Sequence, residues 1–427
     1  MRFKSILSTL FTALVCCSAS GQAQKCHTDE AHQQLLSSNP FMIQQLQANE
    51  ISVRDWIQNN RNGQQRVTST IVTIPVVFHI VYKNNTQNIA DSNIFRQVDI
   101  LNECYRLQNT NFSQTRSIFD TIAADVEVEF CLASVDPAGN PTNGITRTQA
   151  PTSAFFDPIL GFDNVKRSAN GGKDPWPADQ YLNIWICDMS LFGLTAVLGY
   201  AQFPGGNPLT DGVVIQYQFT GFMPNNTTSN KGKTATHEVG HWLGLRHIWG
   251  DGQGSATPCD STDYVDDTPN ADTASQQTCI IKNSCTNESN YWASIGIDPP
   301  DMMENYMDYS YDDCMTMFTL GQKDRMLGFL NTVRTSLLTS PGCGNTSTEE
   351  LAESSIRVYP NPTRDKIQIE STYLEPLRVE ITDISGKIWM QLDREKAMDI
   401  GALPLGVYLI KAVFENGSYR TLRFIKN

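Results

Sequence analysis

Three of the chain's six histidines lie within eleven residues, at positions 237, 241 and 247. Residues four apart share one face of a helix, so His237 and His241 can bind the same metal ion. Gly244 has no Cβ and permits a left-handed turn that would return His247 as a third ligand. Glu238 can accept a proton from water that a zinc ion acidifies and then pass it to a leaving amine. The HExxHxxGxxH spacing therefore predicts zinc-dependent hydrolysis, and it is far more specific than HExxH alone.

The amino-acid composition is typical of a folded protein and argues against a nucleic-acid-binding function. Of the 427 residues, 40% are hydrophobic and 18% are charged, and this length suggests two or three domains. The net charge of −13 opposes nucleic-acid binding, which needs lysine and arginine to neutralise phosphates. Nearly all of the net negative charge lies in residues 251–313, which contain thirteen Asp and Glu and a single lysine, Lys282. This stretch is either a solvated acidic loop or a cation-binding segment.

The N-terminus has the features of an export signal. Arg2 and Lys4 precede an apolar run over 6–15 and then small residues, which predicts a signal peptide at 1–23. The run is too short to span a bilayer, and no later stretch is long enough, so we expect no membrane span and a secreted product. The polar segment 24–66 is expected to be a propeptide, because it ends in a flexible, Asn- and Gln-rich stretch.

Hydrophobic periodicity predicts an α/β or α+β catalytic domain over 67–343. Asp91 or Ser92 could cap its first helix, which places Ile94, Val98, Leu101 and Tyr105 on one face. The expected strands are 71–82, 126–132, 182–187 and 213–219, and the expected last helix is 319–338. A linker at 344–355 then leads to short alternating strands over 356–427, which predict a small all-β, Ig-like sandwich.

The histidine motif and its surroundings resemble the metzincin metallopeptidases, and within them the pappalysin family. Residues 305–309 resemble the pappalysin Met-turn, with Met307 as the turn methionine. Tyr309 resembles the tyrosine that stabilises the tetrahedral oxyanion in relatives. Residues 211–215, including Gly212 and Val213, resemble the edge strand that binds substrate by β-addition. The resemblance implies an α+β catalytic domain with a twisted mixed sheet, backing and active-site helices, one zinc ion, and peptide or protein substrates.

The resemblance also implies how the enzyme is kept latent. Cys26, in the sequence Lys25-Cys26-His27-Thr28, resembles a cysteine switch, in which a propeptide thiolate occupies the open zinc position. The alternative is that Cys26 pairs with another cysteine. The chain's own propeptide is then a partner of the catalytic domain.

Family likeness assigns calcium ligands and disulfides to the acidic stretch. Asp263 and Thr268 resemble calcium ligands, with Asp266 and Asp267 nearby, and their oxygen atoms suit a hard cation. The family's pairing would be Cys259–Cys285 and Cys279–Cys314, although four cysteines allow three connectivities. The pairing of the remaining cysteines is left open by the sequence; these are Cys104, Cys131, Cys187 and Cys343.

Two acidic residues after the Met-turn bear on specificity. Asp312 and Asp313 stand where basic-specific relatives carry a carboxylate that meets Arg or Lys after the scissile bond. The alternative is two exposed aspartates in a turn. With a basic preference, Arg61 and Arg66 would be self-cleavage sites.

Residues 356–427 resemble the sorting domain of the type IX secretion system, which makes the secretion machinery a partner and places the product outside the cell or on its surface. The resemblance rests on 358–362, 383–387 and 405–410. The alternative is an Ig-like accessory module.

Two other functions remain to be weighed for the whole chain. A calcium-dependent adhesion protein with an inactive protease-like domain would suit the acidic stretch and the sandwich, but not the intact Glu238. Zinc hydrolysis of a non-peptide substrate is disfavoured by the edge-strand resemblance, which suits an extended chain. Replacing Glu238 by Ala would discriminate, because binding should survive that change and proteolysis should not.

Overall fold

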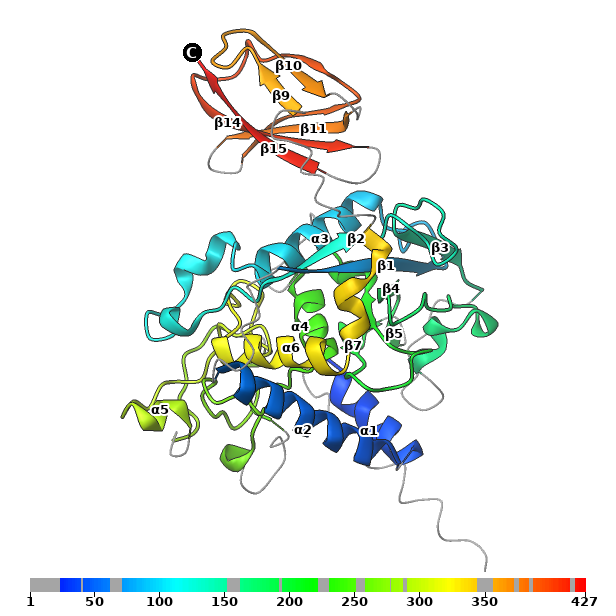
Figure 1. Ribbon diagram of the computed structural model, residues 1–427, viewed down its shortest axis with the longest axis vertical. Coiled ribbons are helices and arrows are strands. Elements are labelled where there is room, and N and C mark those ends of the chain that lie inside the picture. Colours follow the sequence, from blue (N-terminus) through cyan, green and yellow to red (C-terminus); the bar gives the residue numbers. More distant parts are fainter. Residues whose placement is uncertain are drawn as a thin grey trace, which may run out of the picture. The chain divides into compact units, whose positions relative to one another are not determined.

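The computed structural model describes most of the chain (Figure 1). The described residues are 24–39, 41–61, 71–151, 162–191, 194–221, 230–250, 258–276, 278–286, 290–343, 356–371, 376–383, 387–414 and 419–427. The expected signal peptide and linker lie outside them. The chain divides into two compact units, one within 1–131 and 145–340 and the other within 132–144 and 341–427. Residues 132–144, which the sequence places in the catalytic domain, therefore group with the second unit.

A six-stranded mixed sheet forms the framework of the first unit. Its order is β2-β1-β4-β8-β7, and β3 also pairs with β1. Strands β1, β3, β4 and β8 pair in parallel, whereas β7 is antiparallel to β8 and forms the edge. The bounds are β1 Val72–Tyr82, β2 Val128–Leu132, β3 Ile145–Gln149, β4 Leu182–Cys187, β7 Gly199–Ala201 and β8 Val213–Gln216, with a separate two-stranded ribbon of β5 Ser190–Leu191 and β6 Leu194–Thr195.

The central strand β1 is apolar along nearly its whole length, as a strand buried on both faces requires. Phe78 of β1 lies opposite Ile145 on one side and Ile184 on the other. The predicted strands at 71–82 and 182–187 are thus confirmed. The predicted strand at 213–219 ends early, because residues after Gln216 turn into a short 3₁₀ helix.

Three helices of the first unit bear on the site: α3 (Asp91–Tyr105), which packs against α4, α4 (Lys233–Trp242), which packs against β7 and β8, and α6 (Leu320–Thr332). Helix α3 buries the predicted face, and its Tyr105 hydroxyl donates to the Thr236 carbonyl of α4 over 3.1 Å. The expected side-chain cap is wrong, because Ala90 occupies the N-cap of α3. Helix α6 begins with a capping box between Thr319 and Gln322.

A buried ion pair holds the C-terminal end of α4. The guanidinium of Arg334 donates two hydrogen bonds to the carboxylate of Asp211, at 2.6 and 2.8 Å. The Arg334 Nε donates to the carbonyl of Trp242, the last residue of α4, and the Arg334 Cζ lies 4.0 Å from the centre of the Trp242 ring. Since the last carbonyls of a helix have no partner within it, this contact fixes the helix that carries the histidine motif.

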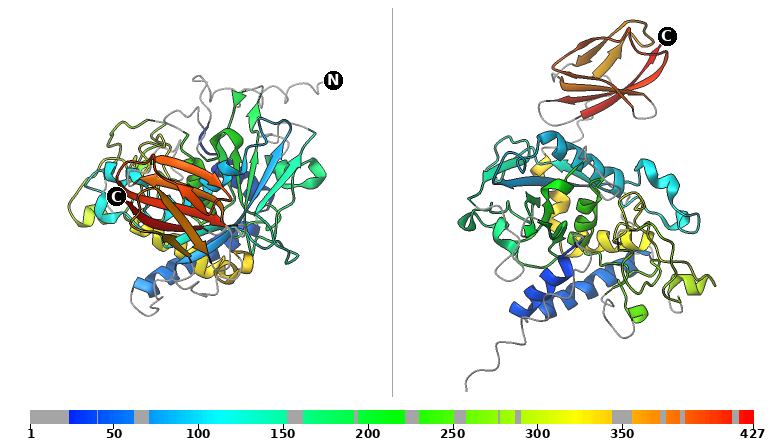
Figure 2. Two further views of the ribbon diagram at one scale, coloured as in Figure 1. Left: turned by 90° about the horizontal axis from the view of Figure 1, so that it is seen from above. Right: turned by 180° about the vertical axis from the view of Figure 1, so that it is seen from behind.

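An N-terminal segment, residues 24–61, lies against the rest of the first unit. It contains α1 (Thr28–Ser38) and α2 (Phe41–Arg61), and α2 packs beside α6, as the blue and yellow helices of Figure 2 show. Gly328 of α6 permits this approach, because a Cβ there would lie 2.9 Å from Val53. Glu50 of α2 accepts two hydrogen bonds from Arg325 of α6, at 2.6 and 2.9 Å. Close packing at Gly328 and the ion pair between Glu50 and Arg325 thus both hold the N-terminal segment in place.

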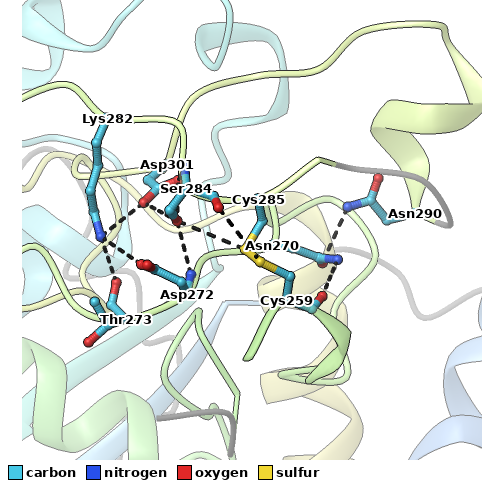
Figure 3. Close-up of a disulfide and its surroundings, with 9 residues drawn as sticks. All are labelled: Cys259, Asn270, Asp272, Thr273, Lys282, Ser284, Cys285, Asn290 and Asp301. Carbon is cyan, nitrogen blue, oxygen red and sulfur yellow. Dashed lines mark hydrogen bonds and ion pairs between the residues drawn. A yellow bond between two sulfur atoms is a disulfide. The ribbon is translucent and has the colours of Figure 1, made fainter. Parts of the chain in front are cut away.

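A long loop region containing the short helix α5 (Tyr291–Ser294) connects α4 to α6 and is held by disulfides. The structure pairs Cys259 with Cys285 (Figure 3) and Cys279 with Cys314, the pairs that the family resemblance implies. Beside the first bond, Asn270 donates to the Cys259 carbonyl over 3.0 Å. Of the cysteines that the sequence leaves open, Cys131 and Cys343 are disulfide-bonded, and Cys104 and Cys187 are free and buried.

The second unit is the expected all-β sandwich. One sheet has the order β13-β10-β9 and the other β12-β11-β14-β15. Their bounds are β9 Ile356–Tyr359, β10 Lys366–Ser371, β11 Pro376–Asp383, β12 Ile388–Asp393, β13 Ala397–Asp399, β14 Gly406–Phe414 and β15 Tyr419–Lys426. The core between the sheets includes Ile369, Ile381, Ile410 and Phe424. Among the described residues, no helix is long and apolar enough to cross a membrane.

Candidate metal centre and substrate cleft

Three imidazole rings converge in the first unit. The Nε2 atom of His241 lies 3.1 Å from those of His237 and His247, which are 3.3 Å from each other. All three side chains are buried. His237 and His241 come from one face of α4, as their spacing predicts.

The hydrogen bonds of the rings define a site for a cation. Each Nδ1 atom faces an acceptor: the carbonyl of Tyr306 at 2.7 Å, the carbonyl of Leu245 at 2.8 Å, and the carboxylate of Asp29 at 2.9 Å. With Nδ1 as the donor, each Nε2 directs a lone pair at the other two, which is unfavourable unless a cation lies between them. Tetrahedral zinc with bonds of about 2.0–2.1 Å places its ligands about 3.3 Å apart. The residues therefore fit zinc.

A glycine turn returns the third histidine to the other two. Gly244 has φ +95°, the left-handed conformation that the sequence predicts. The N–H of Leu245 donates to the Gly240 carbonyl over 2.9 Å and closes the turn. A side chain at Gly244 would also collide with the ring of Phe329, so the position has two reasons to be glycine.

Glu238 is fully buried beside the three rings. Its Oε2 accepts from the hydroxyl of Thr28 over 2.9 Å and from the thiol of Cys26 over 3.4 Å. Its Oε1 has no hydrogen-bond partner among the described residues. Burial raises the pKa of Glu238 to about 8. The carboxyl group is thus placed to hold or release a proton next to the metal position.

The predicted Met-turn lies beneath α4. Met307 is fully buried, and its sulfur would be 2.5 Å from a Cβ at Gly240, so the thioether packs directly on the helix backbone. The ring centre of Tyr309 lies 4.9 Å from that of His247. The Tyr309 hydroxyl donates to the Cys26 carbonyl over 3.3 Å, which shows that it can reach a carbonyl oxygen held at this site.

Cys26 is the fourth member of the metal cluster. Its sulfur and one nitrogen of each histidine all lie within 4.8 Å of one another. Among the described residues, this is the one group of three or more His, Cys, Asp or Glu side chains whose ligand atoms are so close. A soft thiolate is a good fourth ligand for zinc.

Sequence reasoning missed three residues around Cys26. Thr28 bridges Glu238 and the edge strand, because its hydroxyl oxygen also accepts from the Ala201 N–H over 2.9 Å. Asp29 orients the His247 ring, and Lys25 places its ammonium group in a buried pocket. The only available signal was their position next to Cys26 in the sequence.

The structure corrects the edge-strand assignment. Gly212 and Val213 were expected on the edge that binds an extended chain, but β8 lies between β4 and β7 and has no free edge. Gly212 instead lets the chain pass close to β4, because a Cβ there would collide with the Asn183 carbonyl. The edge is β7, where the His27 N–H donates to the Gly199 carbonyl over 3.0 Å.

The two candidate specificity residues, Asp312 and Asp313, lie in different environments. Asp312 is fully buried, and its Oδ2 accepts from the backbone N–H groups of Lys231 and Lys233 at 2.7 and 3.1 Å, where α4 begins. Its Oδ1 lies 3.6 Å from the ammonium of Lys25. Asp313 instead forms a partly exposed ion pair with the side chain of Lys231. The structure thus brings Asp312, and not Asp313, next to Lys25 and the start of α4.

The residues that resemble calcium ligands make two different sets of hydrogen bonds, one within their own loop and one to the start of α6. The Asp263 carboxylate accepts from the Thr268 hydroxyl over 2.8 Å and from the Val265 N–H over 3.0 Å. Burial raises the pKa of Asp263 to about 7. The Asp267 carboxylate faces the start of α6, where it accepts from Thr319 at 2.6 Å and Gly321 at 2.8 Å. Asp266 is exposed.

Comparison with family models agrees with this site. A peptidase family model described as Pregnancy-associated plasma protein-A matches residues 166–331, which include all three histidines, Glu238 and Met307. A second model, described as Secretion system C-terminal sorting domain, matches residues 357–427, nearly the whole of the expected terminal domain.

Individual relatives match over longer stretches of the chain than the peptidase family model does. An extracellular metalloprotease of Arthroderma gypseum is 30% identical over 281 residues, which cover 64% of this chain and 78% of the relative. An extracellular metalloprotease of Colletotrichum graminicola is 29% identical, with 79% of this chain and 99% of the relative covered.

Solved structures include two forms of one bacterial relative. Tannerella forsythia mature mirolysin in complex with a cleaved peptide is 43% identical, with a TM-score of 0.57 and coverage of 63% of this chain and 96% of the other. A promirolysin mutant from the same organism is 39% identical, with a TM-score of 0.61 and coverage of 74% and 97%. The fold, the metal centre and these similarities agree: the chain belongs to the pappalysin family of zinc metalloproteases and ends in a type IX secretion sorting domain.

Proposed function

We propose that this secreted metalloprotease is an endopeptidase that cuts before Arg or Lys and is made as a latent zymogen. The observation that carries the proposal is the buried carboxylate of Asp312, which faces a lysine next to the metal-site cysteine. The cleft thus combines hydrolytic groups with a pocket for one cationic side chain.

Each catalytic group has a distinct role in hydrolysis. His237, His241 and His247 would hold a zinc ion, which would supply the Lewis acidity that polarises a carbonyl and acidifies water. Glu238 takes the proton of the attacking water through its free Oε1 and gives it to the leaving amine. Tyr309 donates a hydrogen bond to the oxygen that becomes negatively charged. The outer edge of β7, to which the N-terminal segment is hydrogen-bonded in the precursor, would pair with the extended substrate backbone once that segment has left.

Asp312 is suited to select a basic residue. Two backbone amides at the start of α4 hold its Oδ2, so the carboxylate is fixed before any substrate arrives. Its Oδ1 is buried with no hydrogen-bond partner among the described residues. An ammonium or guanidinium group would satisfy that oxygen, whereas a neutral side chain would leave the charge buried and unpaired.

Replacing Asp312 by Asn is therefore expected to lower kcat/KM for peptides with Arg or Lys after the scissile bond by about 100-fold, since removing one partner of a buried charge pair costs about 2–5 kcal/mol. Asp313→Asn is the matched control and should change kcat/KM little, because that side chain pairs with Lys231 outside the pocket. The measurement is mass spectrometry of a proteome-derived peptide library digested by each processed enzyme, with and without a zinc chelator. A wild-type digest without basic residues after the cut sites would contradict the proposed specificity.

Latency follows from the position of the N-terminal segment. Cys26 lies at the metal position, and Thr28 occupies the hydrogen-bonding capacity of Glu238 Oε2. Substrate cannot reach Glu238 until this segment leaves. Arg61, at the end of α2, is about half exposed and pairs with Asp324, and we propose it as one self-cleavage site. The second proposed site, Arg66, lies outside the described residues.

We also propose a structural calcium ion at residues 263–268. The support is chemical: Asp263 and Thr268 place oxygen ligands together, Asp267 is buried nearby, and Asp266 is exposed next to them. Hard oxygen ligands in an irregular loop suit Ca²⁺. The ion would join this loop to the disulfide-bonded region around it.

Removing calcium is expected to lower the thermal midpoint of the processed enzyme by about 5–10 °C, the effect of losing a ligand present at about 100 times its Kd. The measurement is thermal unfolding with and without a calcium chelator, at a zinc content verified to be unchanged. Asp263→Asn should abolish the chelator's effect. An equal midpoint with and without calcium would exclude the ion.

A further inference from the structure

Arg325 of α6 presents a fixed guanidinium group to the N-terminal segment. Its side chain is buried, and its Nε donates to the Gly244 carbonyl over 2.8 Å. Its Cζ lies 5.2 Å from the ring centre of Tyr264 and 5.0 Å from that of Phe329. None of these three contacts comes from the N-terminal segment. The catalytic domain therefore orients the two Nη atoms by itself, and such pre-organisation favours tight binding of a carboxylate.

In the precursor, the two Nη atoms of Arg325 hold a carboxylate. They donate to the two oxygens of Glu50, on α2, at 2.9 and 2.6 Å. This bidentate pairing is the geometry that suits Arg and a carboxylate best. Asp263 is also near Arg325, but its oxygens accept from Val265 and Thr268. Among the described residues, Glu50 is thus the acceptor for both Nη atoms.

A second arginine extends the positive charge toward the metal centre. Arg246 directly precedes the metal ligand His247, and its Cζ lies 5.0 Å from the ring centre of Tyr264. The negative charge of Asp29, in the N-terminal segment, acts on both His247 and Arg246. Both arginines are therefore matched in the precursor by carboxylates of the segment that leaves on processing.

A groove of about 460 Å³ connects these arginines with the cleft. One wall belongs to the catalytic domain and includes Phe203, Arg246 and Arg325, and the other wall belongs to the N-terminal segment. The ring centre of Phe203 lies 5.4 Å from that of the metal ligand His241. The groove therefore begins beside the metal centre, just after β7, and leads toward α6. Departure of the segment would open it along its length.

The groove lies on the side of the metal centre that receives residues before the scissile bond. Gln24 pairs with the chain just before β7, and Thr28 accepts from the Ala201 N–H at the end of β7. Asp312, which faces Lys25, is thus toward the start of β7. In the proposed function, Asp312 takes the residue after the scissile bond. Residues before that bond then lie toward the end of β7, where the groove begins.

We propose that Arg325, with Arg246 beside it, forms a carboxylate-binding site in the processed enzyme, which takes an Asp or Glu side chain of the substrate from the part before the scissile bond. This inference deepens the proposed function and rests on it for the side of the cleft. Glu50 shows which chemical group the site accepts. A carboxylate offers two charged acceptor oxygens to the two Nη atoms, whereas the neutral amide of Gln offers one oxygen.

The test uses the processed wild-type enzyme and pairs of peptides. Each pair has Arg after the scissile bond and carries either Glu or Gln at one position before it, and the pairs together scan those positions. The measured quantity is kcat/KM for the Glu peptide divided by that for the Gln peptide. We expect a ratio of about 10 at one position, expressed mainly in KM, because the contact is the same in the ground state and the transition state. Ratios near one at every position would mean that water or another carboxylate replaces Glu50, and would overturn the site.

Variants of α6 assign the preference to Arg325. Arg325→Gln should bring the ratio to about one, and Arg325→Lys, which keeps the charge but loses the second Nη donor, should give an intermediate ratio. Lys323→Gln is the matched control and should keep the wild-type ratio, because Lys323 lies on the same helix but pairs with Glu127. Thermal unfolding verifies that each variant is folded. A preference for Glu that survives in folded Arg325→Gln would overturn the assignment.

Failure of this inference can be told apart from failure of the proposed function. If the wild type cuts before Arg or Lys but treats every Glu and Gln pair alike, the carboxylate site alone is removed. If it has no basic preference, the proposed specificity is removed, and with it the side of the cleft that we assign to the groove.

Discussion

Replacing Glu238 by Gln is expected to lower kcat/KM for peptide hydrolysis by about 10²- to 10⁴-fold, the range for removal of a general acid–base. The reason is positional: Glu238 is the carboxyl group buried beside the three rings, and its Oε1 has no competing hydrogen bond among the described residues. Glutamine keeps the shape of the side chain but cannot take up a proton. The measurement is initial rate against substrate concentration for a peptide with Arg after the scissile bond.

The control for this prediction is metal content. Glu238 is not part of the cluster formed by Cys26 and the three histidines, so the variant should bind as much zinc as the wild type. Because the variant cannot process itself, its N-terminal segment is removed at a protease site engineered into residues 62–70. A variant that retains more than a tenth of wild-type activity would rule out Glu238 as the proton acceptor.

The Cys26→Ala precursor is expected to be prematurely active or to degrade itself. The substitution removes the sulfur atom that lies with the histidine nitrogens and the thiol that donates to Glu238. A loss of about 3 kcal/mol in binding of the N-terminal segment would raise the open fraction by about 100-fold. Activity of freshly purified precursor and its integrity on a gel over several hours provide the measurement.

The double variant Cys26→Ala, Glu238→Gln separates self-degradation from misfolding. It should remain intact, because it has no proteolytic activity, and its thermal midpoint reports the folding cost of losing the thiol. If the Cys26→Ala precursor proves as latent and as stable as the wild type, the cysteine does not control access to the metal.

The metal centre could be predicted because its geometry is local. His237 and His241 are fixed by helical periodicity, and one glycine with positive φ determines the turn to His247. The buried face of α3 and the strands β1 and β4 follow from periodicity in the same way. These features depend on neighbours in sequence, which the amino-acid pattern records.

The cleft could not be predicted, because it depends on contacts between distant parts of the chain. Residues 211–215 have the apolar pattern of a strand, but the pattern does not say whether a strand lies at an edge or inside a sheet. The real edge, β7, has only three residues and carries no strand signal. Asp312 and Asp313 are likewise equivalent in sequence, and only the backbone amides at the start of α4 show which one enters the pocket.

The proposed hydrolysis requires that three imidazoles hold one zinc ion in the processed enzyme. The most direct test is elemental analysis of the folded, processed chain, compared with the His247→Ala variant. We expect about one zinc ion per wild-type chain and a large loss of zinc from the variant. A folded wild-type enzyme without zinc, or a variant that keeps the full amount, would contradict it.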